Sequence, residues 1–155
     1  MKRRSSREYA LQFLYRIDFL DVGSSRDALK NATRAFWDEA REDDEDVRAF
    51  AQHIIEGTLN KLGPIDEEIA RIADKWDLGR MASIDRNILR MGAYELLYCE
   101  DIPAAVSMNE AIEIAKKYST ADSASFINGI LDRIAREAGT DGSRTKKPLQ
   151  TPSES

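Results

Sequence analysis

The chain has 155 residues, of which 42% are hydrophobic and 33% charged, and its formal net charge is −5. This composition is typical of one compact domain, and no apolar run approaches the roughly 20 residues needed to cross a bilayer. The single cysteine, Cys99, has no second cysteine to pair with, and the start at Met1 lacks the apolar segment of a secretory signal. We therefore expect a cytoplasmic protein with no membrane segment.

Charged residues are unevenly distributed along the chain. Up to Arg16 there are five basic residues and one acidic residue, whereas the segment from Asp38 to Asp46 has seven acidic residues and one basic residue. The overall negative charge argues against a nucleic-acid-binding protein, because affinity for phosphate comes largely from Lys and Arg. The local excess of positive charge at the amino terminus nevertheless leaves that function open.

The first part of the chain predicts three helices, because apolar residues recur at intervals of three and four. Ser5 and Glu8 match a capping box, which predicts a helix start there and leaves residues 1–4 as a flexible basic arm. A second helix is expected from Ser24 or Ser25 through about Ala40, and a third over residues 47–59. The expected core positions of the first helix are Tyr9, Ala10, Phe13, Leu14 and Ile17.

Gly63-Pro64 is the strongest internal break, and it predicts two helical subdomains over about 5–62 and 64–138. Proline suits the first position of a fourth helix, whose expected apolar face is Ile65, Ile69, Ile72, Ala73 and Trp76. Three more helices are expected over residues 83–99, from a capping box at Ser107 and Glu110 to Tyr118, and from about Asp122. The fold class is therefore all-α, with about seven helices, followed by a disordered polar tail over 139–155.

The residue types needed for catalysis or metal binding are not found together. The only histidine, His53, has no adjacent nucleophile and no ligand-spaced partner, so we expect a partly exposed helix residue. There are no paired cysteines for zinc and no glycine-rich phosphate loop. The acidic segment lacks the ligand spacing of an EF-hand. We expect neither an enzyme nor a bound cofactor or metal. Cys99 is expected to be a buried or half-buried apolar residue.

Polar and glycine residues interrupt the apolar faces of the later helices. Glu95 and Glu110 favour a structural hydrogen-bond network between helices, since buried polar groups need partners. Gly92 and Gly129 destabilise a helix interior, so we expect them at close helix contacts.

The basic amino terminus is the clearest candidate for ligand binding. Lys2, Arg3, Arg4 and Arg7 can reach phosphates without disturbing a core, although they can equally serve only to keep a terminus soluble. Among Tyr9, Phe13 and Tyr15, which occupy different helix faces, at least one is expected to remain available for stacking on an unpaired base.

An ordered set of segments resembles the NusB family from about residue 3 to residue 136. Each segment is weak alone, whereas their order and spacing together are specific. The segments are Arg7-Glu8-Tyr9-Ala10-Leu11-Gln12 with Leu14-Tyr15, Ile84-Asp85-Arg86-Asn87-Ile88-Leu89-Arg90-Met91, Tyr94-Glu95-Leu96, Ile102-Pro103, Asn109-Glu110-Ala111-Ile112-Glu113-Ile114-Ala115-Lys116 and Phe126-Ile127-Asn128-Gly129-Ile130-Leu131-Asp132.

The resemblance implies an all-helical fold of two subdomains and a role in bacterial transcription. Members of the family bind the single-stranded boxA element of nascent RNA, especially in ribosomal RNA operons, together with NusE, a small-subunit ribosomal protein. The complex joins the RNA polymerase antitermination complex and suppresses premature termination without covalent chemistry. By the same resemblance, the expected RNA-binding residues are Lys2, Arg3, Arg4, Arg7, Gln12, Tyr15, Asp122, Phe126 and Asn128.

Two other functions remain compatible with the sequence. A similar helical module precedes the catalytic domain of some RNA cytosine methyltransferases, although here a polar tail follows the module. A helical adaptor that binds only protein would instead use the acidic segment as its contact surface. Both monomers and homodimers are known among similar proteins, and the sequence does not distinguish between them. Phe126 also has a second interpretation, because periodicity alone places it in the core.

Overall fold

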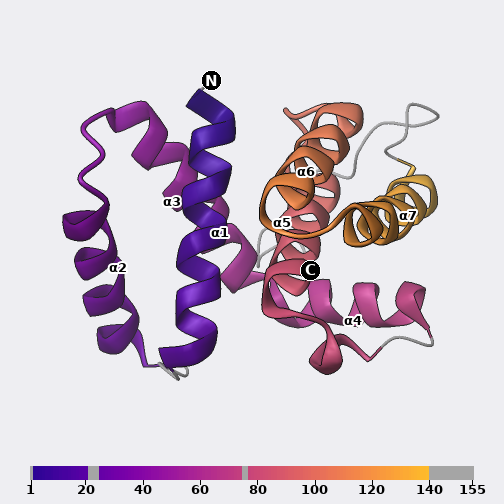
Figure 1. Ribbon diagram of the computed structural model, residues 1–155, viewed down its shortest axis with the longest axis horizontal. Helices are drawn as coiled ribbons and strands as arrows, with labels where there is room; N and C mark the ends of the chain where they lie inside the picture. The colour runs from indigo at the N-terminus through magenta and orange to yellow at the C-terminus, as the bar shows by residue number, and fades with distance from the viewer. Residues whose placement is uncertain (1, 21–24, 75–76, 140–155) are drawn as a thin grey trace, which may run out of the picture. The chain divides into compact units, whose positions relative to one another are not determined.

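The computed structural model describes residues 2–20, 25–74 and 77–139, and these ranges are helical apart from short connections. No strand occurs in the described ranges, so the expected all-α fold class is confirmed. None of the described helices has the length and hydrophobicity needed to cross a membrane. The elements are α1 (Lys2–Leu20), α2 (Arg26–Ala40), α3 (Glu45–Asn60), α4 (Leu62–Ala73), the 3₁₀ turn η1 (Leu78–Arg80), α5 (Ser83–Tyr98), α6 (Ala104–Tyr118) and α7 (Ala121–Ala138) (Figure 1).

The first helix begins earlier than the sequence predicts. α1 starts at Lys2 rather than at Ser5, so residues 2–4 form its first turn and not a flexible arm. The hydroxyl of Ser6 lies 2.8 Å from the carbonyl oxygen of Val47 and 3.0 Å from that of Lys2. These contacts hold the first turn against the start of α3, which supplies the stabilisation that the Ser5 capping box was expected to give.

The chain divides into two compact units between Glu56 and Gly57, within α3. The predicted boundary at Gly63-Pro64 instead falls in the first turn of α4. Proline does not break a helix at such a position, because the amide hydrogens of the first turn have no partner within the helix. The units are described separately below. Apart from Gly139, the expected tail over 139–155 lies outside the described residues, and so does Trp76.

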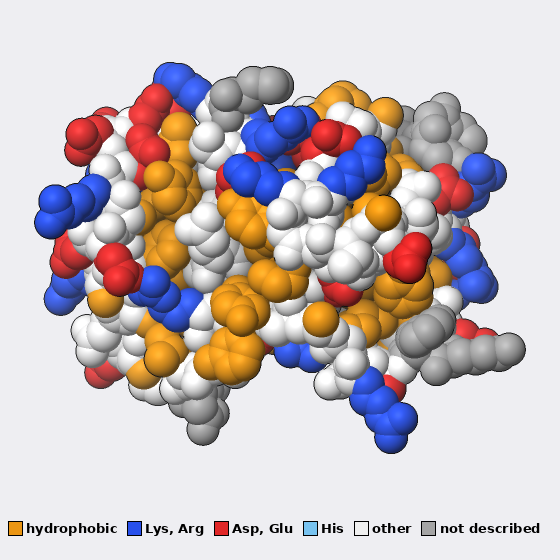
Figure 2. Space-filling model, in the orientation of Figure 1, with side chains coloured by type: hydrophobic (Ala, Val, Ile, Leu, Met, Phe, Trp, Pro, Cys, Tyr) orange, Lys and Arg blue, Asp and Glu red, His pale blue; other side chains and the backbone are white. Residues whose placement is uncertain are grey.

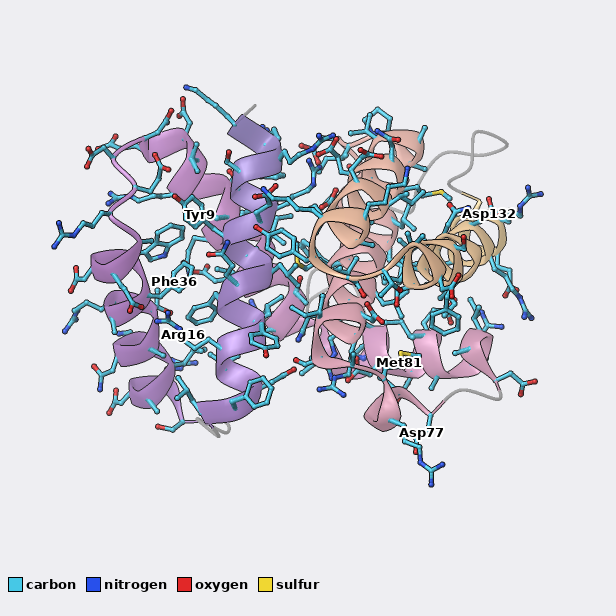
Figure 3. The ribbon with its side chains drawn as sticks, in the orientation of Figure 1. Tyr9, Arg16, Phe36, Asp77, Met81 and Asp132 are labelled. Atoms are coloured by element: carbon cyan, nitrogen blue, oxygen red, sulfur yellow. The ribbon has the colours of Figure 1, made fainter. Side chains whose placement is uncertain are left out.

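Aromatic side chains fill the space between α1 and α2 in the amino-terminal unit. The ring of Phe36 lies 5.5 Å from that of Phe13 and 5.0 Å from that of Trp37, in edge-to-face arrangements. Tyr9 packs on both Phe36 and Trp37 and donates a hydrogen bond to Glu42 Oε1 at 2.9 Å (Figure 3). The predicted core positions Ala10, Phe13 and Leu14 are buried, whereas Tyr9 and Ile17 are half-buried.

Helix α5 is the centre of the carboxy-terminal unit, where it packs against α4, α6 and α7 (Figure 1). Most of its residues from Asn87 to Leu96 are buried. A Cβ atom at Gly92 would lie 2.8 Å from Leu131 Cδ1, so this glycine allows α5 and α7 to approach closely, as expected. The same expectation is wrong for Gly129, where a Cβ atom would have no neighbour within 4 Å, because this residue lies on the exposed side of α7.

A buried hydrogen bond links α5 to α6. The hydroxyl of Ser107 donates to Glu95 Oε1 at 2.8 Å, and both side chains are buried. This confirms the structural role expected for Glu95. The predicted capping box at Ser107 and Glu110 is wrong, because α6 already begins at Ala104 and the Ser107 hydroxyl is used between helices.

Candidate nucleic-acid interface

The amino group of Lys2 faces two carboxylates of the acidic segment. Its Nζ atom lies 3.1 Å from Asp44 Oδ2 and 3.4 Å from Asp46 Oδ2. The hydrogen bonds to Asp44 and then Asp46 raise the pKa of Lys2, and the hydrogen bond from Lys2 lowers the pKa of Asp44. In the space-filling view, basic and acidic side chains lie together at the end of the unit where α1 begins (Figure 2).

The two arginines that follow on the α3 side of α1 contact an aromatic ring. The Arg3 guanidinium lies 3.8 Å from the centroid of Phe50, and that of Arg7 lies 5.3 Å from it. Arg3 is exposed, whereas Arg7 is only 4% exposed. The structure therefore corrects the expectation that Arg7 extends outward to phosphates, because α1 is already helical there and directs this side chain towards Phe50.

A second face of α1 carries the other predicted residues. With 3.6 residues per turn, Arg4 and Tyr15 point about 20° apart and Gln12 about 60° from Tyr15. Tyr15 is 40% exposed and Gln12 is exposed, while Phe13 is fully buried and Tyr9 half-buried, so Tyr15 is the most available for stacking of the three aromatic residues considered from the sequence. Its ring lies 4.9 Å from that of Phe19. Lys2 points about 160° away from Arg4, so the basic residues do not share one helix face.

The carboxy-terminal unit contains a cavity of about 620 Å³ at the starts of α5 and α7. The 3₁₀ turn η1 forms one side, and Asp77 and Met81 lie at this turn in Figure 3. Asp77 Oδ1 accepts a hydrogen bond from the Gly79 amide at 2.9 Å, which fixes the turn. The lining residues are Asp77, Arg80, Met81, Asp85, Asp122, Ser123 and Phe126.

Asp85 connects the two helices that form this cavity. Its carboxylate oxygens accept hydrogen bonds from the hydroxyls of Ser119 at 2.7 Å and Ser123 at 2.8 Å. Thr120 caps α7 by accepting from the Ser123 amide at 3.0 Å. These contacts fix the first turn of α7, so the position of Asp122 is set by the fold.

Two of the three predicted residues of α7 line the cavity. Phe126 is half-buried, which reconciles its apolar periodicity with a place at a binding surface. Asp122 is exposed beside it, whereas Asn128 is exposed on α7 but is not among the lining residues described. A half-buried ring can stack on an unpaired base, and neighbouring carboxylates can accept hydrogen bonds from the amino groups of that base.

The cavity also includes residues that sequence patterns did not single out for binding. Asp85 belongs to a family-like segment, but its spacing gave no sign of the two serines that it contacts. Arg80 and Met81 lie in and after η1, a turn that apolar periodicity does not predict. His53 is an exposed helix residue and Cys99 is buried, both as expected. The described residues include no cluster of three or more potential metal ligands.

Comparison with known proteins identifies the family. The NusB family model matches residues 4–136. A transcription antitermination protein NusB from Thermodesulfovibrio yellowstonii is 50% identical over 141 residues, covering 88% of this chain and 93% of the relative. The structure of T. maritima NusB has a TM-score of 0.76 and 40% identity, covering 87% of this chain and 91% of that one.

A more distant structure shares the fold. A crystal structure of the antitermination factors NusB and NusE in complex with double-stranded RNA contains a chain with a TM-score of 0.74 and 23% identity, covering 88% of this chain and 97% of that one. The matched region includes α1 from residue 4 and α7 to residue 136, so it contains the predicted residues of both helices except Lys2 and Arg3. This chain belongs to the NusB family.

Proposed function

We propose that this chain is a transcription antitermination factor that binds the boxA element of nascent RNA together with NusE. The observation that carries the proposal is family membership over residues 4–136, with a 50% identical relative named for antitermination. The distant structural neighbour forms a complex with NusE and RNA, which supports the choice of partners. The factor acts by binding in the bacterial cytoplasm, as part of the RNA polymerase antitermination complex, and catalyses no reaction.

In the amino-terminal unit, α1 offers groups for both phosphates and bases. Lys2, Arg3 and Arg4 supply positive charge for the phosphates of a single strand. Tyr15 offers an exposed ring for base stacking, and the amide of Gln12 on the same side of the helix can form hydrogen bonds with a base edge. Arg7 has a supporting role in this proposal, since it is buried beside Phe50.

In the carboxy-terminal unit, the cavity beside α7 takes an unpaired base. The ring of Phe126 stacks on it, and the Asp122 carboxylate accepts hydrogen bonds from amino groups on the base edge. Asn128 lies outside the cavity lining and contacts the RNA from the exposed surface of α7. NusE binds the helices of this unit, and no individual residues are assigned to that contact.

The 50% identical relative from T. yellowstonii is named a transcription antitermination protein, which favours this function over that of the helical module of an RNA cytosine methyltransferase. If the protein binds no RNA, a helical adaptor that binds only protein becomes the favoured function.

The proposal is tested by titrating labelled single-stranded boxA RNA with the protein, with and without NusE, against a scrambled RNA of the same length. We expect tighter binding to boxA, strengthened by NusE. Three phosphate contacts predict that log affinity falls with log salt with a slope of about −2, at about −0.7 per contact.

The charge-neutralised variant Lys2→Gln/Arg3→Gln/Arg4→Gln should flatten this slope. A matched control, Arg26→Gln/Lys30→Gln/Arg34→Gln, removes the same charge from exposed positions of α2 in the same unit and should keep the slope near that of the wild type. Equal binding of boxA and scrambled RNA in the presence of NusE would contradict the proposal, and absent binding of both would favour the adaptor.

A further inference from the structure

The acidic segment has no role in the proposed function, yet two of its side chains contact the basic amino terminus. Asp44 and Asp46 flank Lys2 Nζ at 3.1 and 3.4 Å. Lys2 is one of the residues proposed to bind RNA phosphates. A carboxylate oxygen and a phosphate oxygen are both anionic hydrogen-bond acceptors, so they can occupy the same position beside the amino group.

Capping of α3 explains the position of only one of the two carboxylate oxygens of Asp44. Its Oδ1 atom accepts from the amide of Asp46 at 2.9 Å and from that of Val47 at 3.4 Å, as an N-terminal cap does. Its other oxygen, Oδ2, faces Lys2. The cap therefore explains Oδ1, and the contact with Lys2 is a separate function of Oδ2.

Asp46 also contacts the Lys2 amino group, although its side chain does not cap α3. Its side chain is 84% exposed, so the carboxylate could remain fully hydrated, but Oδ2 lies within hydrogen-bond distance of Lys2 Nζ. Two carboxylates around one amino group leave an excess of negative charge at this position. That excess repels an approaching phosphate and attracts the amino group that the phosphate would need.

The backbone geometry keeps Lys2 beside these carboxylates. The buried hydroxyl of Ser6 lies within hydrogen-bond distance of the Lys2 and Val47 carbonyl oxygens, and Val47 is in the first turn of α3. A hydroxyl can donate to only one acceptor at a time, but either bond helps to anchor this turn. Arg3 is held on the same side by its contact with Phe50 at 3.8 Å.

We propose that Asp44 and Asp46 form an autoinhibitory contact that competes with RNA phosphates for Lys2. This inference rests on the proposed function, because it concerns one of the residues that bind RNA there. Non-specific binding comes almost entirely from phosphate contacts, whereas boxA also gains from base contacts. An internal competitor for Lys2 therefore weakens binding to any RNA whose phosphate uses this amino group, and the effect is easiest to isolate with unrelated RNA, where few other contacts contribute.

The first experiment needs no RNA and measures the acetylation rate of the Lys2 amino group by mass spectrometry. Asp46→Asn should raise this rate, because it removes one of the two carboxylates that hold the amino group in its protonated, unreactive form. Asp43→Asn is the matched control. It removes the same charge from an exposed neighbouring residue of the described connection, one that forms no ion pair with Lys2.

The second experiment compares the affinities of the same full-length variants for boxA RNA and for scrambled RNA. Asp46→Asn should bind scrambled RNA about two- to fivefold more tightly than Asp43→Asn does, the range expected for an exposed ion pair. Asp44→Asn, which keeps an oxygen for the α3 cap, should change affinity in the same direction. In the Lys2→Gln background the advantage of Asp46→Asn over Asp43→Asn should disappear.

The outcomes separate this inference from the proposed function. Equal Lys2 reactivity in Asp46→Asn and Asp43→Asn would overturn the contact itself, and equal RNA affinity of the two variants would overturn the competition. An Asp46→Asn advantage that persists without Lys2 would also overturn it, because the effect would then be one of general charge. Binding of RNA without preference for boxA would contradict the proposed function alone, since competition for phosphates would still be measurable.

Discussion

A surface ion pair in one unit can be compared with a buried hydrogen bond in the other. In the amino-terminal unit, the ion pairs of Lys2 with Asp44 and of Arg16 with Glu39 are at the surface. In the carboxy-terminal unit, the contact between Ser107 and Glu95 is buried between two helices. Surface pairs contribute little to stability and can exchange partners, whereas buried polar groups strongly resist the loss of theirs.

The difference separates two ways of presenting a binding group. Lys2 is held by carboxylates that another anion can replace, so its availability depends on salt and on competing ligands. Phe126 is carried by a helix whose first turn is fixed by Asp85 through two serines. The first unit therefore offers exchangeable charge, and the second offers a cavity of fixed geometry, to which the proposed function assigns a base.

The strongest expected disruption is Gly57→Ala in the carboxy-terminal unit. A Cβ atom at this position would overlap the ring of Tyr94, which is buried and cannot move without displacing α5. We expect a loss of about 3 kcal/mol in the free energy of unfolding. Gly63→Ala is the control, because nothing lies within 4 Å of its Cβ position. Urea denaturation measures both variants, and equal stabilities would show that the helix packing is more tolerant than the structure indicates.

Glu95→Ala tests the buried contact directly. It removes the acceptor of the Ser107 hydroxyl and leaves a buried donor and a small void, for an expected loss of about 2 kcal/mol. Glu113→Ala, which removes an exposed side chain paired with Lys116 on α6, should change stability by less than about 0.5 kcal/mol. Chemical denaturation of the two variants measures both losses in the free energy of unfolding. Similar losses would contradict the distinction between buried and surface contacts.

Loss of one stacking ring should weaken RNA binding about tenfold in either unit. The variants are Tyr15→Leu in α1 and Phe126→Leu in α7, assayed with boxA RNA and NusE. Phe19→Leu is the control, because it alters a 66% exposed ring next to Tyr15 that is not proposed to bind RNA. Circular dichroism checks that each variant is folded. An effect of Phe19→Leu as large as that of Tyr15→Leu would shift the stacking site along α1.

The smallest expected effect is a change in how the free energy of unfolding depends on pH in the acidic range. Hydrogen bonds from Arg133 and then Arg71 lower the pKa of Glu137, and Lys2 lowers that of Asp44. A carboxylate whose pKa is lower in the folded than in the unfolded state stabilises the protein above the unfolded value of about 4. This contribution is lost as the pH falls through the folded value.

Glu137→Gln and Asp44→Asn should therefore be less stable than the wild type near pH 6 and approach it near pH 2. Urea denaturation between these limits measures the difference, with Asp43→Asn as a control that removes a carboxylate but no ion pair with Lys2. A difference that stays constant over this range would show that the two variants act through packing rather than charge.

Periodicity predicted the helices well but not where they begin. The N-terminal cap at Ser25, which accepts from the Ala28 amide, depends on neighbouring residues alone and could be foreseen. The starts of α1 and α6 depend on distant partners: Ser6 contacts Val47, and Ser107 contacts Glu95. A capping motif in the sequence cannot show that its hydroxyl is already used between helices.

The candidate binding residues divide in the same way. Exposure of Tyr15 and burial of Phe13 follow from the helix period, whereas Phe126 lies half-buried at a cavity although periodicity alone placed it in the core. The burial of Arg7 could not be predicted, because it depends on Phe50 being brought beside α1. The pairing of Lys2 with the acidic segment was equally hidden, although both charge clusters are evident in the sequence.

The division of the chain inside α3 has a consequence for dissecting the protein into fragments. The boundary between Glu56 and Gly57 lies within a helix that continues to Asn60. Cutting there would separate the amide groups that follow from their backbone acceptors in the preceding turn. A cut one residue later would also separate the Lys61 amide from its acceptor, the Gly57 carbonyl. A fragment that contains only one unit should therefore be cut outside α3 and not within it. A protease should cleave at the boundary only after local unfolding of the helix.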